Sequence, residues 1–418
     1  MWVLAFRKRL SGIVKERIVN IMRGKKLTGM VVAFIVGAVV LCSCGVASEP
    51  ESTAVPQLPV EQDKAVYVEQ AVPYDVSENV QVEGYSTESG GITALTPDGT
   101  PMMLVELYNK SDEIEYKYAK VLYNDSVWSV KEEAWLEQWN KETAEKNYMI
   151  EDFQYGEDGY LYVKCVEESM PHTKFWSDRE KYMDDYYTVG IHLFRINEDE
   201  NTITEIPIPQ ERLEGEEEDL KKMPGFVGCE FSVFADGNLL LLSYQGRVNG
   251  IYSGVTGEKL ADIDPAAGVE NRLADVSAGD GFFAFTSADQ ESGRMQVNVV
   301  GEDGKLINAI PTEAIVDMED GGVYEPKISA KEDTIMMAST EGIFEAEPAS
   351  SSFTCVVNPE KDNLYYLPSE GYFVMDCIGK GEQEDYLLFL CNDEADAAEA
   401  SKVFKICRYA RKDSLPVQ

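Results

Sequence analysis

Short hydrophobic runs alternate with Asp-Gly or other Gly-rich turns along most of the chain, from about residue 64 onward. The recurring unit is an acidic turn followed closely by an apolar segment. Asp98-Gly99, for example, comes shortly before the run PMMLV, and Asp236-Gly237 comes before NLLLL. Tight turns of this composition between short apolar runs are typical of β-hairpins. The pattern therefore predicts β-strands throughout this part of the chain.

The acidic turns recur at a roughly constant spacing. They are separated by 60, 78, 44, 53 and 52 residues and stand at Asp98, Asp158, Asp236, Asp280, Asp333 and Asp385. Two further turns, at Gly257 and Gly304, are 47 residues apart, close to the 44 residues between the acidic turns that precede them. A period of about 40–50 residues with four strands per unit predicts a β-propeller.

Burial gives the physical reason for such a repeat. A lone four-stranded sheet cannot bury both of its faces, whereas sheets stacked around an axis do so and leave only short edges. We therefore predict an all-β propeller of six to seven four-stranded blades over residues 64–416, with the turn-then-strand phrase forming the inner strands. Residues 65–85 could close the ring against the last blade. A two-sheet sandwich is the alternative.

Three segments interrupt the pattern. Residues 131–147 contain good helix formers, with Trp135 and Trp139 four positions apart. This predicts a short helix, or a strand followed by a polar loop. Residues 167–187 and 210–225 are long and charged. In a propeller such loops decorate one face of the disc, where ligands usually bind.

A basic stretch and an apolar run precede the repeats. The sequence RGKK at residues 23–26 is followed by twelve charge-free residues, 30–41, and the tetrad LCSC ends at Cys44. This run suits a secretory signal and is short of the ~20 apolar residues that a spanning helix needs. The tetrad resembles the cleavage site of bacterial lipoproteins, which implies a signal peptide over residues 1–43 and lipidation of Cys44. An uncleaved anchor is the alternative. Because a complete signal begins at Met22, that residue is a second candidate for the true start.

The same resemblance implies a location. A diacylglyceryl group on Cys44 would supply the two acyl chains, palmitate for example, that stable anchoring needs. Residues 44–63 are rich in Pro, Ser, Glu and Ala, which is typical of a flexible linker. We expect a lipoprotein held to the cell membrane, with its propeller on the extracytoplasmic side.

The repeat unit is similar to the loose Asp-x-Asp-Gly-Asn-Leu-Tyr repeats of extracellular bacterial propellers. The phrase CRYARKDSLP at residues 407–416 resembles the end of the propeller in clostridial lipoproteins, where a solute-binding domain follows. This likeness covers residues 64–416. It implies an accessory role in solute uptake, although the sequence ends where the second domain of those proteins begins.

Charge argues against nucleic acid as a partner. The chain has 37 Lys and Arg against 75 Asp and Glu, a formal net charge of −38. Loss of residues 1–43 would remove eight basic residues and one acidic residue and leave a net charge near −45. Phosphates of nucleic acids and anionic lipid headgroups repel such a chain.

Six cysteines follow Cys44 in the chain. They are Cys165, Cys229, Cys355, Cys377, Cys391 and Cys407. Most lie inside apolar runs and none belongs to a C-x-x-C motif, so we expect buried free thiols rather than a zinc site. One cross-strand disulfide, between Cys391 and Cys407, is the alternative.

No catalytic constellation stands out. The chain has two histidines, His172 and His192, and contains no G-x-S-x-G, H-E-x-x-H, P-loop or dinucleotide fingerprint. Residues 197–201 begin like a calcium loop, but Thr202 and Ile208 stand where Gly and Glu are required, so we interpret the segment as an acidic hairpin turn. We expect no cofactor and no metal, and we assign no catalytic residue.

Aromatic residues gather in segment 167–187. They are Phe175, Trp176, Tyr182, Tyr186 and Tyr187. Aromatic faces on a loop can stack on sugar rings or anchor a protein partner, or they can pack the loop onto the disc. Our leading hypothesis is a binding module for an envelope protein, a peptide or a glycan. A carbohydrate-active lyase or hydrolase that uses Asp, Glu and Tyr in the central depression is the alternative.

Overall fold

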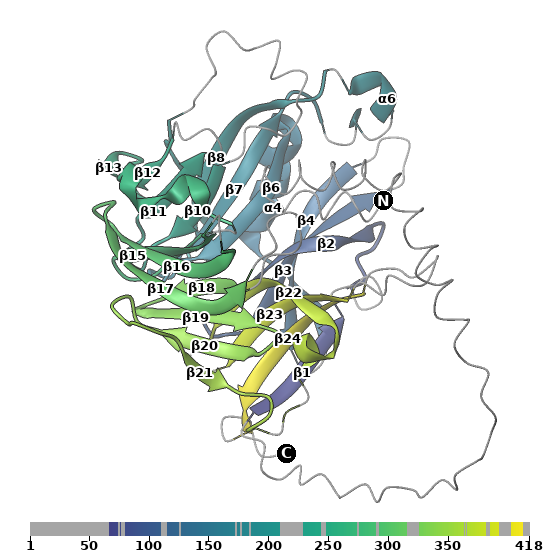
Figure 1. Ribbon diagram of the computed structural model, residues 1–418. Helices are drawn as coiled ribbons and strands as arrows, with labels where there is room; N and C mark the ends of the chain where they lie inside the picture. Colours follow the sequence, from purple (N-terminus) through teal and green to yellow (C-terminus); the bar gives the residue numbers. More distant parts are fainter. Residues whose placement is uncertain are drawn as a thin grey trace, which may run out of the picture.

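The computed structural model describes residues 67–412 apart from internal gaps, of which 210–228, 316–325 and 393–402 are the longest. The described strands form six four-stranded antiparallel sheets, arranged as the blades of a propeller (Figure 1). The predicted all-β propeller is therefore confirmed, with six blades. The predicted signal peptide, Cys44 and the linker lie outside the described residues.

Each blade is numbered in chain order, and its strands are given from the axis outward. Blade 1 consists of β2 (Ser86–Leu95), β3 (Pro101–Asn109), β4 (Glu115–Asn124) and β5 (Val127–Lys131). Blade 2 consists of β6 (Tyr148–Tyr155), β7 (Leu161–Glu168), β8 (Thr188–Asn197) and β9 (Thr202–Ile206). Blade 3 consists of β10 (Cys229–Val233), β11 (Leu239–Ser243), β12 (Gly250–Tyr252) and β13 (Lys259–Ala261).

The other three blades follow the same plan. Blade 4 consists of β14 (Ser277–Ala278), β15 (Phe282–Ala288), β16 (Arg294–Gly301) and β17 (Leu306–Ile315). Blade 5 consists of β18 (Lys327–Lys331), β19 (Thr334–Ser339), β20 (Gly342–Ala346) and β21 (Thr354–Val357). Blade 6 consists of β22 (Tyr372–Lys380), β23 (Tyr386–Asn392), β24 (Val403–Arg411) and β1 (Tyr67–Pro73).

Strand β1 closes the ring. It pairs antiparallel with β24, in a register that runs from Tyr67 opposite Arg411 to Pro73 opposite Lys405. Blade 6 is thus built from strands at both ends of the described chain, which lie side by side in Figure 1. This confirms the prediction that residues 65–85 contribute a strand to the last blade.

The repeated phrase forms the second strand of every blade, one place farther from the axis than the innermost strand. The acidic turn is the hairpin that joins these two strands, and Gly99, Gly159 and Gly237 have φ of 80°, 81° and 82° in it. Only glycine adopts this conformation without steric cost. The prediction was thus right about the hairpin and wrong by one strand about the position. The innermost strands range from two residues in β14 to ten in β2 and share no common phrase, so they do not stand out as a repeat.

The core consists of one hydrophobic cluster at each of the six junctions between neighbouring blades. Side chains along a strand point alternately to its two faces. In β23, Leu387 and Phe389 therefore face blade 1, whereas Leu388 and Leu390 face blade 5. Both faces of each blade are covered in this way, as the predicted circular stacking requires.

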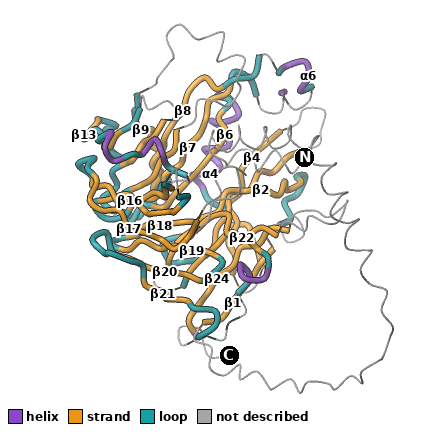
Figure 2. The backbone as a smooth tube through the Cα atoms, in the orientation of Figure 1, coloured by secondary structure: helices purple, strands orange, loops and turns teal. Residues whose placement is uncertain are grey.

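Helix α4 (Ala134–Lys146) follows blade 1 and packs against both blades 1 and 2 (Figure 2). Trp135 and Trp139 are 0% and 2% exposed, and the ring of Trp139 meets Phe194 edge-on at 4.9 Å. The helix prediction for this segment is confirmed. No helix in the part of the chain that the structure describes is long and apolar enough to cross a membrane.

The described residues form no seventh blade, for which the early spacings left room. The spacing of 60 residues between Asp98 and Asp158 contains α4, and the spacing of 78 residues after Asp158 contains the connections 169–187 and 207–228. A short helix, α6 (Arg179–Tyr182), lies in the first of these connections. Among the described residues, this extra length adds no further sheet.

The six cysteines between Cys165 and Cys407 are free thiols, and five of them are buried. This confirms the predicted free thiols and overturns the alternative of a Cys391–Cys407 disulfide. Although β23 and β24 are neighbours, Cys391 lies opposite Phe404 and Cys407 lies opposite Leu388. The two thiols are thus three positions out of register, beyond the reach of a disulfide.

Candidate functional site

A cavity of about 520 Å³ lies along the propeller axis. The innermost strands of all six blades line it, together with the hairpin turns that end them. Each blade contributes at least one polar or glycine residue to the wall, for example Thr93, Gln154, Ser232, Ser277, Ser329 and Gly379. The cavity is therefore the place where side chains from the whole ring come closest together.

Side chains of one blade cap the inner strand of the next. An innermost strand has one edge without a neighbouring strand, so its backbone N–H groups need other acceptors. Three such bonds join consecutive blades: Val233 N to Gln154 Oε1 (3.2 Å), Ala278 N to Ser232 Oγ (2.9 Å) and Ala330 N to Ser277 Oγ (2.7 Å). The polar residues around the axis are thus part of the joint between blades.

Sequence reasoning missed this set of bonds, although a local signal was present. The dipeptides Ser232-Val233, Ser277-Ala278 and Ser329-Ala330 occupy corresponding places in blades 3, 4 and 5. In each dipeptide the serine lies at the inner edge and the following apolar residue packs between blades. The signal is short, and it becomes visible only when the blades are aligned.

A buried lysine lies in the wall between blades 2 and 3. Lys164 is 6% exposed, and its Nζ donates to the carbonyl oxygen of Cys229 at 2.5 Å and lies 3.2 Å from Glu151 Oε2. The Glu151 contact is an ion pair by distance without hydrogen-bond geometry. Burial disfavours the ammonium, but the carboxylates of Glu151 and Asp152 outweigh burial and raise the pKa of Lys164.

A second ion pair lies beside the first. The Nε of Arg272 donates to Glu230 Oε2 at 2.8 Å, and its Nη1 donates to the carbonyl of Val269 at 3.2 Å. Arg272 follows two short 3₁₀ turns, Pro265–Ala267 and Val269–Asn271, on the connection from blade 3 to blade 4. Lys164 bonds to the carbonyl of Cys229 and Arg272 bonds to the side chain of the next residue, Glu230, so both cations contact the start of β10.

At the hairpin end of the cavity, a contact joins opposite blades. Glu157 Oε1, in the first hairpin of blade 2, accepts a hydrogen bond from Glu332 N in the first hairpin of blade 5, at 2.9 Å. Glu332 has φ 48°, and its carbonyl accepts from Asp280 N of blade 4 at 2.6 Å. The hairpins of blades 2, 4 and 5 are thereby connected at this end of the axis.

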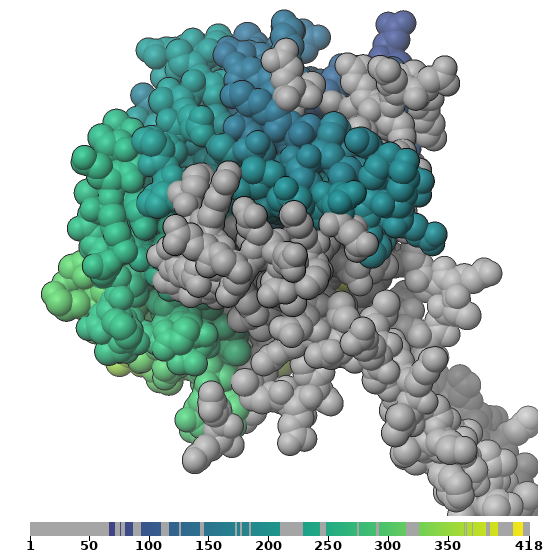
Figure 3. Space-filling view, turned by 90° about the horizontal axis from the view of Figure 1, so that it is seen from above, coloured from purple at the N-terminus to yellow at the C-terminus, as the bar shows by residue number. Residues whose placement is uncertain are grey.

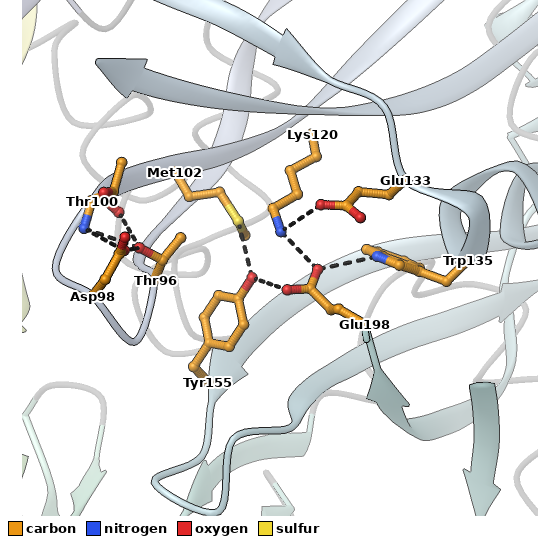
Figure 4. A network of polar contacts seen from close by, with 9 residues as sticks. All are labelled: Thr96, Asp98, Thr100, Met102, Lys120, Glu133, Trp135, Tyr155 and Glu198. Atoms are coloured by element: carbon orange, nitrogen blue, oxygen red, sulfur yellow. Dashed lines mark hydrogen bonds and ion pairs between the residues drawn. The ribbon is translucent and has the colours of Figure 1, made fainter. Parts of the chain in front are cut away.

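A polar network supports the cavity wall from behind (Figure 4). The carboxylate of Glu198 accepts hydrogen bonds from Lys120 Nζ (2.7 Å), Trp135 Nε1 (3.1 Å) and Tyr155 OH (2.8 Å), and Figure 4 shows it between these three side chains. Burial and the neighbouring Glu198 charge raise the pKa of Tyr155, which lines the cavity. The network therefore fixes Tyr155 and joins it to α4 and to blade 1.

Glu198 belongs to segment 197–201, for which the sequence predicted an acidic hairpin turn. The segment does connect β8 to β9, and Asn197 Oδ1 accepts from Glu200 N at 3.1 Å. The prediction is confirmed, but it gave no sign that Glu198 bonds with blade 1 and α4. Those partners are 43 to 78 residues away in the chain, so no local pattern could indicate them.

The aromatic residues predicted for the binding loop pack largely within their own segment. Phe175 is buried and stacks on Tyr186, with centroids 3.8 Å apart. The Tyr186 hydroxyl donates to Glu168, and the Tyr182 ring lies beneath Lys174 and Lys181.

Tyr187 is half-buried and exchanges hydrogen bonds with Ser169 through its backbone. Trp176 lies outside the described residues. Figure 3 shows blade 2 and its insertion in teal on one face of the molecule. Contact of these aromatic residues with a ligand stays a prediction.

His192 does not belong to the cavity wall. His192 lies in β8 between Glu167 (3.1 Å from Nε2) and Glu205 (2.7 Å from Nδ1), and its ring lies 4.5 Å from the tilted ring of Tyr148. His172 lies outside the described residues. Within the described ranges, no group of three His, Cys, Asp or Glu side chains is placed to hold a metal ion.

No protein-family model matches this chain, and no curated protein matches it. Among solved structures, it is similar to a protein of unknown function from Dyadobacter fermentans, with 8% identity and a TM-score of 0.39 over 83% of this chain and 100% of that one. TolB from Acinetobacter baumannii (9% identity, TM-score 0.31) is matched over 78% of this chain and 66% of its own. A family 117 glycoside hydrolase from Zobellia galactanivorans (7% identity, TM-score 0.32) is matched over 85% and 93%. The chain spans only 39% and 44% of the length of two matched peptidase structures. These likenesses concern the propeller fold alone.

Proposed function

We propose that this protein is a binding module, a lipid-anchored propeller that holds a glycan, a peptide or a segment of a partner protein at its central cavity. The observation that supports the proposal is the cavity wall at the start of β10. There, the paired strands β6 and β7 hold Glu151 against Lys164, and Glu230 of β10 meets Arg272 from the connection between blades 3 and 4. Recognition sites need a few polar groups fixed in orientation on a rigid scaffold.

The pairing of charges favours binding over catalysis. Hydrolysis of a glycosidic bond uses two carboxyl groups in different environments, one as proton donor and the other as base or nucleophile. Glu151 and Glu230 each have a cation as a close partner instead. One observation favours the alternative of a carbohydrate-active hydrolase or lyase, because Glu151, Asp152, Glu230 and Asp376 all line the same cavity as Tyr155.

The experiment that tests this proposal compares binding with turnover. The purified protein is applied to immobilised panels of glycans and peptides and to whole cell-envelope extract, and the same glycans are examined for cleavage by mass spectrometry. We expect retention of one class without cleavage. Cleavage products that disappear in Glu151→Gln or Glu230→Gln variants would establish the enzyme instead, and no retention from any source would refute the binding module.

The membrane anchor is a separate part of the proposal and has its own test. Cys44 in the tetrad LCSC is the proposed lipidated residue. The full chain expressed in a bacterial host should take up labelled palmitate and fractionate with membranes, and Cys44→Ala should do neither. A Cys42→Ala variant is the matched control and should keep the label. Equal labelling of all three proteins would refute the assignment.

A further inference from the structure

We infer that the central cavity binds a neutral, polyhydroxylated molecule, a mono- or disaccharide in chemical class, against the adjoining Glu151–Lys164 and Glu230–Arg272 pairs. This inference rests on the proposed binding function and names the ligand class. The cavity volume of about 520 Å³ lies within the ~300–1,000 Å³ typical of small-molecule sites. The decisive features are how the charges are paired and which hydrogen-bonding groups remain.

Within each of the two pairs, the positive and the negative charge cancel before any ligand binds. Lys164 has Glu151 at 3.2 Å, and Arg272 has Glu230 at 2.8 Å. An anionic ligand would have to compete with a carboxylate for Lys164 or Arg272, and a cationic ligand would have to compete with a cation for Glu151 or Glu230. Burial of an unpaired charge is costly. A neutral ligand avoids that cost and leaves both pairs intact.

The pairs still have unused hydrogen-bonding capacity. A guanidinium has five N–H donors in a planar fork, and the described partners of Arg272 use its Nε and Nη1. Its Nη2 has no partner among the described residues, and neither has Oε1 of Glu230. An N–H donor and a carboxylate acceptor therefore belong to one pair that lines the cavity.

A hydroxyl group matches such a pair because it both donates and accepts. One sugar hydroxyl can accept from Arg272 Nη2, and a neighbouring hydroxyl can donate to Glu230 Oε1. An amine can satisfy only the carboxylate, and a carboxylate can satisfy only the guanidinium.

Apolar recognition is not available at this part of the wall. Phe153 and Phe231 line the cavity but are 1% and 2% exposed. Their rings are therefore committed to the clusters between blades and cannot form a pocket for an apolar peptide side chain. Selection among ligands then depends on hydrogen bonds, which favours a ligand rich in hydroxyl groups.

The inference is tested by calorimetric titration and thermal shift of the purified protein with four kinds of probe. These are neutral hexoses, neutral disaccharides such as maltose, cellobiose and lactose, the acidic sugar glucuronate, and the polyamine spermidine. We expect binding of at least one neutral sugar and no binding of glucuronate or spermidine at the same concentration. Tighter binding of either charged probe would overturn the inference.

Two variants direct the test to the ion pairs. Arg272→Lys keeps the charge and loses the fork, so it should weaken the neutral sugar about tenfold, the loss of one or two hydrogen bonds to a charged group. Glu230→Gln leaves the guanidinium without a counter-charge, so glucuronate should now bind better than it binds the parent protein. Circular dichroism checks that each variant is folded. If one variant fails to fold, the affinity measured for the other variant still tests the inference.

The matched control is the exposed pair Lys305–Asp303 at 2.7 Å, whose side chains are 71% and 60% exposed. Asp303→Asn should leave all four titrations unchanged. If the neutral sugar binds but neither cavity variant changes its affinity, the inference fails and the proposed binding function survives. If envelope proteins or peptides are retained while every sugar is inert, the ligand class named here is wrong.

Discussion

The second strand and the innermost strand of each blade are neighbours, yet they obey different rules. Second strands such as β11 (LLLLS) and β15 (FFAFTSA) are paired on both edges and covered on both faces, so continuous apolar runs suit them. Innermost strands such as β10 (CEFSV) and β14 (SA) are short and have one unpaired edge toward the axis. The comparison teaches that the repeat encodes the fold, whereas the departures from it supply the candidate site.

The largest loss of stability should come from truncating a buried side chain in a second strand. Phe285 of β15 is fully buried in the cluster between blades 3 and 4. Phe285→Ala should lower the free energy of unfolding by about 4 kcal/mol, through lost transfer energy and the cavity that remains. Urea denaturation followed by tyrosine and tryptophan fluorescence measures this.

Val255, which is 66% exposed in the outer turn of blade 3, provides the control. Val255→Ala should change the free energy of unfolding by less than about 0.5 kcal/mol. Equal losses in the two variants would contradict the assignment of the core to the second strands.

The sequence shows the second strands because their burial leaves a regular apolar signal, and it shows α4 because Trp135 and Trp139 recur at helical spacing. It does not show the cavity wall. Arg272 and Glu230 are 42 residues apart, and Glu157 and Glu332 are 175 residues apart. No local pattern links such pairs. Arg272 meets Glu230 because the chain returns to the axis after blade 3, and Glu157 meets Glu332 because the blades form a ring.

The described aromatic residues of segment 167–187 show the opposite case, in which residues that are conspicuous in the sequence do not belong to the candidate site. Phe175 and Tyr186 stand out in the sequence, but most of their interactions are with the insertion and the end of β7. A cluster that is conspicuous in one segment can be satisfied within that segment. Groups that converge from several blades are individually inconspicuous, which is why the charged pairs at the start of β10 escaped prediction.

The next largest loss of stability is expected at Lys164, a charged residue in the middle of the second strand β7. Lys164→Met keeps the length of the side chain but leaves Glu151 and the Cys229 carbonyl without their partner. We expect a loss of about 3 kcal/mol, at the lower end for breaking a buried pair because Glu151 is 19% exposed. Chemical denaturation at pH 7 measures the difference.

The pH dependence of this difference follows from the raised pKa of Lys164. The folded protein holds the proton more tightly than the unfolded chain, so the stabilisation is complete below the unfolded value of about 10.4. It is lost as the pH rises from there through the higher folded value. The gap between parent and Lys164→Met should therefore be constant from pH 6 to 9 and shrink only in stronger alkali. A gap that closes between pH 6 and 9 would contradict the buried ion pair.

A smaller loss of stability should follow from removing the Glu198 carboxylate, which lies behind the cavity wall. Glu198→Ala removes the acceptor shared by Lys120, Trp135 and Tyr155, while Lys120 keeps Glu133 at 3.2 Å. We expect about 2 kcal/mol of destabilisation. Hydrogen exchange should show faster opening of α4 than of β15. Uniform acceleration across all blades would mean that Glu198 does not act through the helix.

The smallest loss of stability is expected at the inner edge of β14, the innermost strand of blade 4. Ser277→Ala removes the acceptor for Ala330 N, a bond of 2.7 Å between blades 4 and 5, without opening a cavity. The loss should be about 1 kcal/mol, a quarter of that expected for Phe285→Ala, although both residues belong to blade 4. Exchange of the Ala330 amide should accelerate while amides of β15 stay protected. If Ser277→Ala instead costs as much as Phe285→Ala, the inner edge is as important to the fold as the core between blades. The interpretation that innermost strands can vary in sequence without loss of the fold would then be wrong.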